Sequence, residues 1–138
     1  MKYLILLLAS LTSLVACKSN DLPEGAECGR VSIFMKPPEP QGLYPVQIDR
    51  IDDRAVVKSG AYVLEPGVYL VKTYEIITDP RLKLPGRDRG TSKRIEIKVE
   101  ANKRYHVAAK FIPEKRYSKR NEYWEPVVWQ VTDEPCGS

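Results

Sequence analysis

The chain has few of the side chains that build catalytic and metal sites. It contains one histidine, His106, and three cysteines among 138 residues. One histidine without a free thiol supplies no plausible catalytic triad or metal-ligand set, and no serine lies in a Gly-x-Ser-x-Gly pattern. His106 lies on the polar side of an alternating segment, so we predict that it is an exposed sheet residue. These shortages argue against an enzyme and against a metal or other cofactor.

The sequence also lacks a helical hydrophobic period and a second long apolar run. Segment 86–93, GRDRGTSK, has neither the spacing of a phosphate-binding loop nor a helix after it, so we interpret it as a solvated loop. Asp49, Asp52 and Asp53 are close enough in sequence to bind a cation, but turn residues that hydrogen-bond their own backbone are the commoner explanation. No nucleotide or cation site is therefore expected.

What the chain does have is a distinctive start. Lys2 precedes an apolar stretch, residues 4–15, which has the length of the apolar region of a secretory signal and is too short to span a membrane. The stretch ends in Leu14-Val15-Ala16-Cys17, which resembles the lipobox of bacterial lipoproteins, Leu-(Ala/Ser/Val/Thr)-(Gly/Ala)-Cys. The resemblance implies that residues 1–16 are a signal peptide and that Cys17 becomes the lipidated N-terminus, anchored by its acyl chains without spanning the membrane. The alternative is an ordinary secretory signal that happens to contain a cysteine.

The same resemblance suggests a location. Residue 18 is Lys rather than Asp, and in Gram-negative lipoproteins this favours export to the outer membrane over retention at the inner one. We therefore expect an outer-membrane lipid anchor and a protein that faces the periplasm. Residues 17–27 are polar, contain Pro and Gly and lack periodicity, so they are expected to form a flexible tether.

Charge and cysteine content constrain the rest of the chain. Residues 17–138 carry 21 Lys and Arg, all of the chain's 22 except Lys2, against 18 Asp and Glu, a net charge of +3 that is too weak to indicate nucleic acid binding. Once Cys17 is assigned to lipid, Cys28 and Cys136 form an even pair in an oxidising compartment, which predicts a disulfide. Closing a loop of this length is worth about 4 to 5 kcal/mol in the chain-entropy model. The alternative is two free thiols.

Alternation with period two dominates residues 28–138. The clearest example is RIEIKVE, residues 94–100, where the aliphatic side chains face one way and the charged ones the other. Eleven prolines and eight tyrosines, with only two phenylalanines, also indicate many turns and strands. We expect one all-β domain, an antiparallel β-sandwich of seven or eight short strands. The predicted strands are at 31–35, from 46, 55–58, 61–64, 68–77, 94–100, 103–112 and 127–131. In the strand at 103–112, Tyr105, Val107, Ala109 and Phe111 are expected on one side.

Residues 45–112 also carry a family resemblance. YVLEPGVYLVKTYEI, followed by IEIKVEANKRYHVAAKF, is similar to the small PEGA or prealbumin-like (immunoglobulin-like) sandwiches of bacterial envelope proteins. The shared features are a strand, a Pro-Gly turn, a second strand, and a strand that ends in a turn before Lys-x-Tyr. The resemblance implies the fold and no activity. Pro66-Gly67 is separately predicted to form the centre of a type II turn, since Pro fixes the first φ and Gly supplies the positive second one.

Two predicted connections, residues 79–94 and the loop before the last strand, are rich in basic residues. In an antiparallel fold, connections two apart tend to lie at the same end, so these loops are expected at one pole and the Ala101-Asn102 turn at the other. The candidate binding surface comprises Arg81, Lys83, Arg87, Arg89, Lys115, Arg116, Lys119, Arg120, Tyr117 and Trp124. The expected ligand is an anionic glycan, a lipid headgroup or an acidic envelope protein. The alternative is two loops that charge merely keeps solvated.

Together these features predict a monomeric, lipid-anchored β-sandwich of the Gram-negative envelope that acts as a non-catalytic binding or structural module. The alternative is an envelope-associated enzyme with a site that the sequence does not reveal. Cys28 and Cys136 can share a pole only if the chain crosses the sandwich an even number of times, which requires residues 55–58 to be a real strand. The basic loops then lie at the pole away from the anchor.

Overall fold

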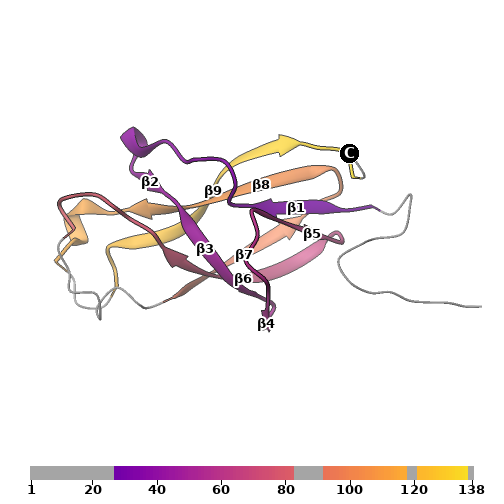
Figure 1. Cartoon of the computed structure of the whole chain (residues 1–138), viewed down its shortest axis with the longest axis horizontal. Coiled ribbons are helices and arrows are strands. Elements are labelled where there is room, and N and C mark those ends of the chain that lie inside the picture. The colour runs from indigo at the N-terminus through magenta and orange to yellow at the C-terminus, as the bar shows by residue number, and fades with distance from the viewer. Residues whose placement is uncertain (1–26, 83–91, 118–120, 137–138) are drawn as a thin grey trace, which may run out of the picture.

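The computed structural model describes residues 27–82, 92–117 and 121–136. They form an elongated, all-β sandwich of two packed sheets, which confirms the predicted fold class (Figure 1). The described elements are β1 (Gly29–Ser32), the 3-10 helix η1 (Glu39–Gln41), β2 (Leu43–Tyr44), β3 (Val46–Ile51), β4 (Arg54–Ala55), β5 (Ala61–Leu64), β6 (Gly67–Glu75), β7 (Lys93–Val99), β8 (Lys103–Phe111), the 3-10 helix η3 (Pro113–Lys115) and β9 (Trp124–Asp133).

The two sheets have different widths. The five-stranded sheet has the order β2-β8-β1-β5, with β9 on β8, and the four-stranded sheet has the order β4-β3-β6-β7. Every pair is antiparallel except β1 with β8, where Val31 lies opposite Tyr105 in a parallel register. The prediction of a purely antiparallel sandwich is therefore wrong at this one pair. The reason is that β1 and β8 start at the same pole, where the backbone N–H of Asn102 donates to the carbonyl of Cys28 at 2.7 Å.

The core between the sheets follows the predicted alternation. Ile97 and Val99 of β7 are buried, and so are all four side chains predicted to share one face of β8. These four are Tyr105, Val107, Ala109 and Phe111. Burial of this apolar surface, worth roughly 25 cal/mol per Å², is what holds the sheets together.

Three local predictions need correction. The alternation does not predict β2, because a strand of two residues ended by Pro45 shows no period. Residues 55–58 are not a strand: only Arg54–Ala55 pairs with β3, and the chain then returns along an irregular path to Gly60. That path still reverses the chain, so the number of crossings stays even. Gly67 begins β6 without a positive φ, so the prediction of a type II turn at Pro66-Gly67 is wrong. Residues 65–66 instead connect the two sheets.

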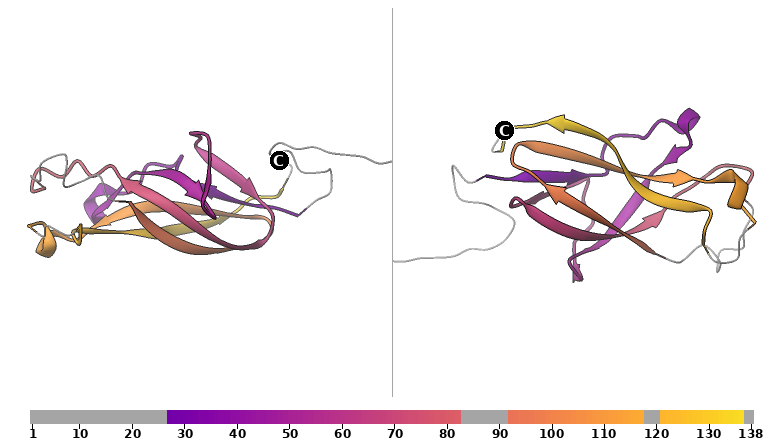
Figure 2. Two further views of the ribbon diagram at one scale, coloured as in Figure 1. Left: turned by 90° about the horizontal axis from the view of Figure 1, so that it is seen from below. Right: turned by 180° about the vertical axis from the view of Figure 1, so that it is seen from behind.

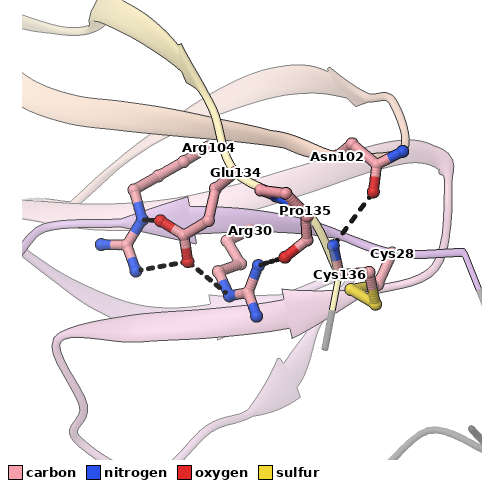
Figure 3. Close-up of a disulfide and its surroundings, with 7 residues drawn as sticks. All are labelled: Cys28, Arg30, Asn102, Arg104, Glu134, Pro135 and Cys136. Atoms are coloured by element: carbon pink, nitrogen blue, oxygen red, sulfur yellow. Dashed lines mark hydrogen bonds and ion pairs between the residues drawn. A yellow bond between two sulfur atoms is a disulfide. The ribbon is translucent and has the colours of Figure 1, made fainter. Parts of the chain in front are cut away.

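Both ends of the described chain lie at one pole, which we call the disulfide pole. Cys28 and Cys136 are joined by a disulfide with 5.4 Å between their Cα atoms, which confirms the predicted pair. The Asn102 turn lies at the same pole, since its Oδ1 accepts the backbone N–H of Cys136 at 3.0 Å (Figure 3). The described parts of the two basic connections lie at the opposite end, the loop pole, and the further views show the same separation (Figure 2).

Candidate functional site

The loop pole brings together the two connections that the sequence marked as basic. The guanidinium of Arg81 lies 5.3 Å from the centre of the Phe111 ring at the end of β8. The ammonium of Lys93, at the start of β7, donates to the carbonyl of Trp124 at 2.5 Å. Five members of the candidate surface lie outside the described residues: Lys83, Arg87, Arg89, Lys119 and Arg120. The described members are Arg81, Lys115, Arg116, Tyr117 and Trp124.

Arg81 is engaged by a neighbouring carboxylate. Its Nε and Nη2 donate to the two oxygens of Asp79 at 3.0 and 2.8 Å, and Tyr44 donates its hydroxyl to the same carboxylate at 2.9 Å. Hydrogen bonds from Arg81 hold the pKa of Asp79 well below its usual range, against the opposing effect of burial. The charge of Arg81 is therefore largely balanced within the protein, and this residue contributes little net charge to the surface.

Lys115, Arg116 and Tyr117 follow one another after β8, with Lys115 and Tyr117 exposed and Arg116 half-buried. Arg116 donates to the carbonyl of Pro113 at 2.7 Å, and its guanidinium lies 4.7 Å from the centre of the Tyr117 ring. Tyr117 is 78% exposed, and Lys115 has no ion pair with any residue that the structure describes. A cation held over an exposed aromatic face, beside a free ammonium, can contact an anionic ligand directly.

Trp124 does not belong to this surface. It is 0% exposed, and its indole N–H donates to Oδ1 of Asn121 at 2.8 Å. The ammonium of Lys93 lies 5.6 Å from its ring centre, and burial lowers the pKa of that lysine. The prediction of a surface tryptophan is wrong because β9 begins at Trp124 and its ring closes this end of the core. Tyr123 is equally buried.

His106 is also buried, at 3% exposure, so its prediction as an exposed sheet residue is wrong. It lies on the face of β8 away from the core, but a register shift in the β8–β9 pairing brings Trp129 against it, with ring centres 5.8 Å apart. Its Nε2 lies 2.9 Å from the Thr132 hydroxyl, while its Nδ1 has no partner in the described structure. Burial, and then the charge of Arg104, lowers the pKa of His106. No group of three potential metal ligands occurs among the described residues.

A charge cluster at the disulfide pole was not predicted from the sequence (Figure 3). Glu134 lies 3.1 Å from Nε of Arg30 and 2.8 Å from Nε of Arg104, which come from the adjacent strands β1 and β8. Arg104 also donates to the Ser32 hydroxyl at 2.9 Å, and Arg30 to the carbonyl of Pro135 at 3.4 Å. The cluster holds the C-terminal segment against β1. The sequence signal was an arginine directly before the strand predicted at 31–35 and another within the strand predicted at 103–112. Only the strand order shows that the two are neighbours.

A groove of about 550 Å³ was not predicted either. It lies between β5 and the segment that contains β4, and Tyr69 of β6 also lines it. Its volume falls in the usual range of ligand sites. The lining residues are Ile51, Asp52, Arg54, Ala55, Val56, Val57, Ser59, Ala61, Tyr62, Val63, Leu64 and Tyr69.

Two further findings bear on the function. Within the described ranges, no helix is long and apolar enough to cross a membrane. The chain matches no protein-family model, no curated protein and no solved structure. The lipobox and the PEGA-like or prealbumin-like resemblances therefore stay predictions from the sequence.

Proposed function

We propose that this chain is a lipoprotein of the bacterial outer membrane that holds a monomeric, non-catalytic binding module on the periplasmic side. Residues 1–16 act as the signal peptide, and the acylated Cys17 is the anchor. The lipobox supports the anchor. The exposed cationic and aromatic side chains of the loop pole support the binding role.

One observation carries the proposal: the described basic side chains lie at the pole opposite Cys28, where the proposed tether joins the domain. Cys28 follows Cys17 by eleven residues, which reach roughly 35 Å at full extension. β8 has nine residues and runs from the disulfide pole to the loop pole, about 30 Å. Lys115, Arg116 and Tyr117 therefore lie at the end of the domain farthest from the point where the tether enters, and the tether is long enough for that end to reach envelope components in the periplasm.

The proposed ligand is an anionic component of the envelope, either a glycan or an acidic protein. Lys115 and Arg116 supply the positive charge, and the Tyr117 ring supplies a flat apolar surface beside it. Contacts of this kind at an exposed site are individually weak, so binding should depend on several charges together and weaken as salt is added.

Charge reversal tests this proposal. In the Lys115→Glu/Arg116→Glu variant, the fraction of protein that sediments with purified peptidoglycan, or that cross-links to acidic envelope proteins, should fall severalfold. The matched control is Lys36→Glu/Lys98→Glu, which makes the same change of net charge at exposed positions of other segments. Equal binding of the parent and both variants to both kinds of component would show that the loop pole is only solvated surface.

A further inference from the structure

The two sheets leave an open seam along one side of the sandwich. β5 is the edge of the five-stranded sheet, and β4 is the edge of the four-stranded sheet. The groove is lined by all four residues of β5 and by the consecutive residues 54–57 opposite them. A sheet face presents only alternate residues, so this groove runs along the strand edges themselves. Main-chain groups therefore contribute to its wall.

The hydrogen bonds of β5 show which main-chain groups are free. Both the N–H and the carbonyl of Ala61 bond to the Ser59 hydroxyl, at 3.4 and 2.9 Å, so Ala61 turns these groups away from β1. In an antiparallel ladder this orientation recurs at every second residue. Val63 therefore turns its N–H and carbonyl toward the groove, where the described part of the chain supplies no partner for them. At the next such position, the carbonyl of Glu65 accepts the Tyr69 hydroxyl at 2.6 Å.

Two tyrosines hold the ends of the groove in shape. At one end the Tyr62 hydroxyl donates to the carbonyl of Val57 at 2.7 Å and accepts the N–H of Ser59 at 3.1 Å. At the other end Tyr69 is tied to Glu65. Burial raises the pKa of both tyrosines, as expected for phenols packed into an apolar wall. The groove is therefore formed before any ligand arrives, which lowers the entropy cost of binding.

The segment that faces β5 across the groove, residues 54–58, carries two positive charges and no acid. Arg54 and Lys58 are exposed, and neither has an ion pair with a described residue. The nearest acids act elsewhere along the groove: Asp52 accepts the N–H of Leu70 at 2.7 Å, Asp52 and Glu65 lie close enough to Tyr69 to act on it electrostatically, and Asp53 lies 3.6 Å from Arg94. A ligand with a carboxylate next to an apolar segment would match this arrangement.

We propose that the seam between β4 and β5 binds an extended, acidic-apolar peptide segment of another protein. One residue of the peptide pairs with Val63 through two main-chain hydrogen bonds, as an added strand does at a sheet edge. Its neighbours place apolar side chains in the groove, and a carboxylate lies near Arg54 and Lys58. This site is separate from the loop pole and does not rest on the function proposed there.

Two other occupants fit less well. Pairing of β5 with β5 of a second copy would bring both sets of Arg54 and Lys58 together, and like charges across a sheet are unfavourable. The hydroxyls of Ser59 and Tyr69 also cap the edge on both sides of Val63, which protects it from longer strand pairing. An amphiphile without an amide would cover the groove but leave the N–H and carbonyl of Val63 unsatisfied, which is costly.

Substitutions at Val63 test the proposal. The probe is a library of fluorescein-labelled hexapeptides that alternate Val, Ile or Tyr with Thr and end in Asp or Glu, measured by fluorescence anisotropy. Val63→Pro removes the free N–H, while Val63→Ala keeps it and shortens the same side chain. Since this N–H faces away from β1, proline is compatible with the edge strand. For the peptides that the parent binds, Val63→Pro should weaken binding about tenfold and Val63→Ala distinctly less.

Independent controls keep the result interpretable. If Val63→Pro fails to fold by circular dichroism, the parent is tested with peptides N-methylated at each position in turn, one of which should lose binding. Lys115→Glu/Arg116→Glu should bind the peptides normally, whatever the outcome at the loop pole. The proposal is overturned if no library member binds the parent, if N–H removal in protein and peptide has no effect, or if the parent is a dimer that peptide does not dissociate.

Discussion

The side-chain Oδ1 of Asn102 accepts the backbone N–H of Cys136 at 3.0 Å, so the β7–β8 turn and the C-terminal segment form one structure. The backbone N–H of the same asparagine donates to the carbonyl of Cys28, which ties the turn to the start of the domain as well. Asn102 has φ of 64°, a left-handed conformation that asparagine adopts more readily than most residues. The disulfide therefore closes a pole that hydrogen bonds already organise.

The disulfide should contribute strongly to stability. Replacing both Cys28 and Cys136 with Ala should lower the free energy of unfolding by about 4 kcal/mol, because the loop it closes spans most of the domain. Urea unfolding under non-reducing conditions measures the difference. The parent in excess reductant should approach the variant. Alkylation of the unfolded, unreduced parent followed by mass spectrometry should find no free thiol at these positions; two alkylated thiols would contradict the bond.

The carboxylate of Glu134 should contribute more to the stability of the fold than the carboxylate of its exposed neighbour, Asp133. Glu134→Gln leaves the guanidinium groups of Arg30 and Arg104 without a counter-charge in a poorly solvated place, so it should destabilise the protein by about 2 to 3 kcal/mol. The matched control is Asp133→Asn, which breaks only an exposed pair with Lys103 and should leave stability almost unchanged. Equal unfolding midpoints for the two variants in urea would contradict this assignment.

His106 should make the protein less stable in mild acid. Its folded-state pKa lies below the ordinary value of 6.5, so the unfolded chain binds the proton more tightly. The free energy of unfolding should therefore fall as pH drops below about 6.5, until the folded-state pKa is also passed. It is the chain's one histidine, so His106→Gln should flatten the profile between pH 7 and 5. An NMR titration midpoint at or above 6.5 in the folded protein would contradict the prediction.

The sequence predicted the features that depend on local pattern. Alternation alone assigned the core faces of β7 and β8, because each side chain there simply follows the pleat. The disulfide between Cys28 and Cys136 was predicted because two cysteines remain, an even number, in a compartment that is expected to be oxidising. Trp124 and His106 were misplaced because neighbours distant in sequence bury them: the closing end of the core in one case, and Trp129 at a register shift in the other. Residue type and spacing carry no information on such neighbours.

The groove could not have been predicted from the sequence. Its existence depends on β4 and β5 being the free edges of two different sheets, which is a property of strand order. The sequence predicted a strand at 55–58 because this short run lies between a turn at 51–54 and Ser59-Gly60. In the structure the same residues leave β3 after a short hairpin and form one wall of the seam.

The most direct test of the central claim is metabolic labelling with radioactive palmitate. If the chain is a lipoprotein anchored through Cys17, the parent should incorporate label, lose residues 1–16 and fractionate with the outer membrane. Cys17→Ala should remain a full-length precursor without label, while Cys28→Ala/Cys136→Ala should be labelled normally. Label that persists in Cys17→Ala, or a parent that is cleaved and carries no lipid, would contradict the account.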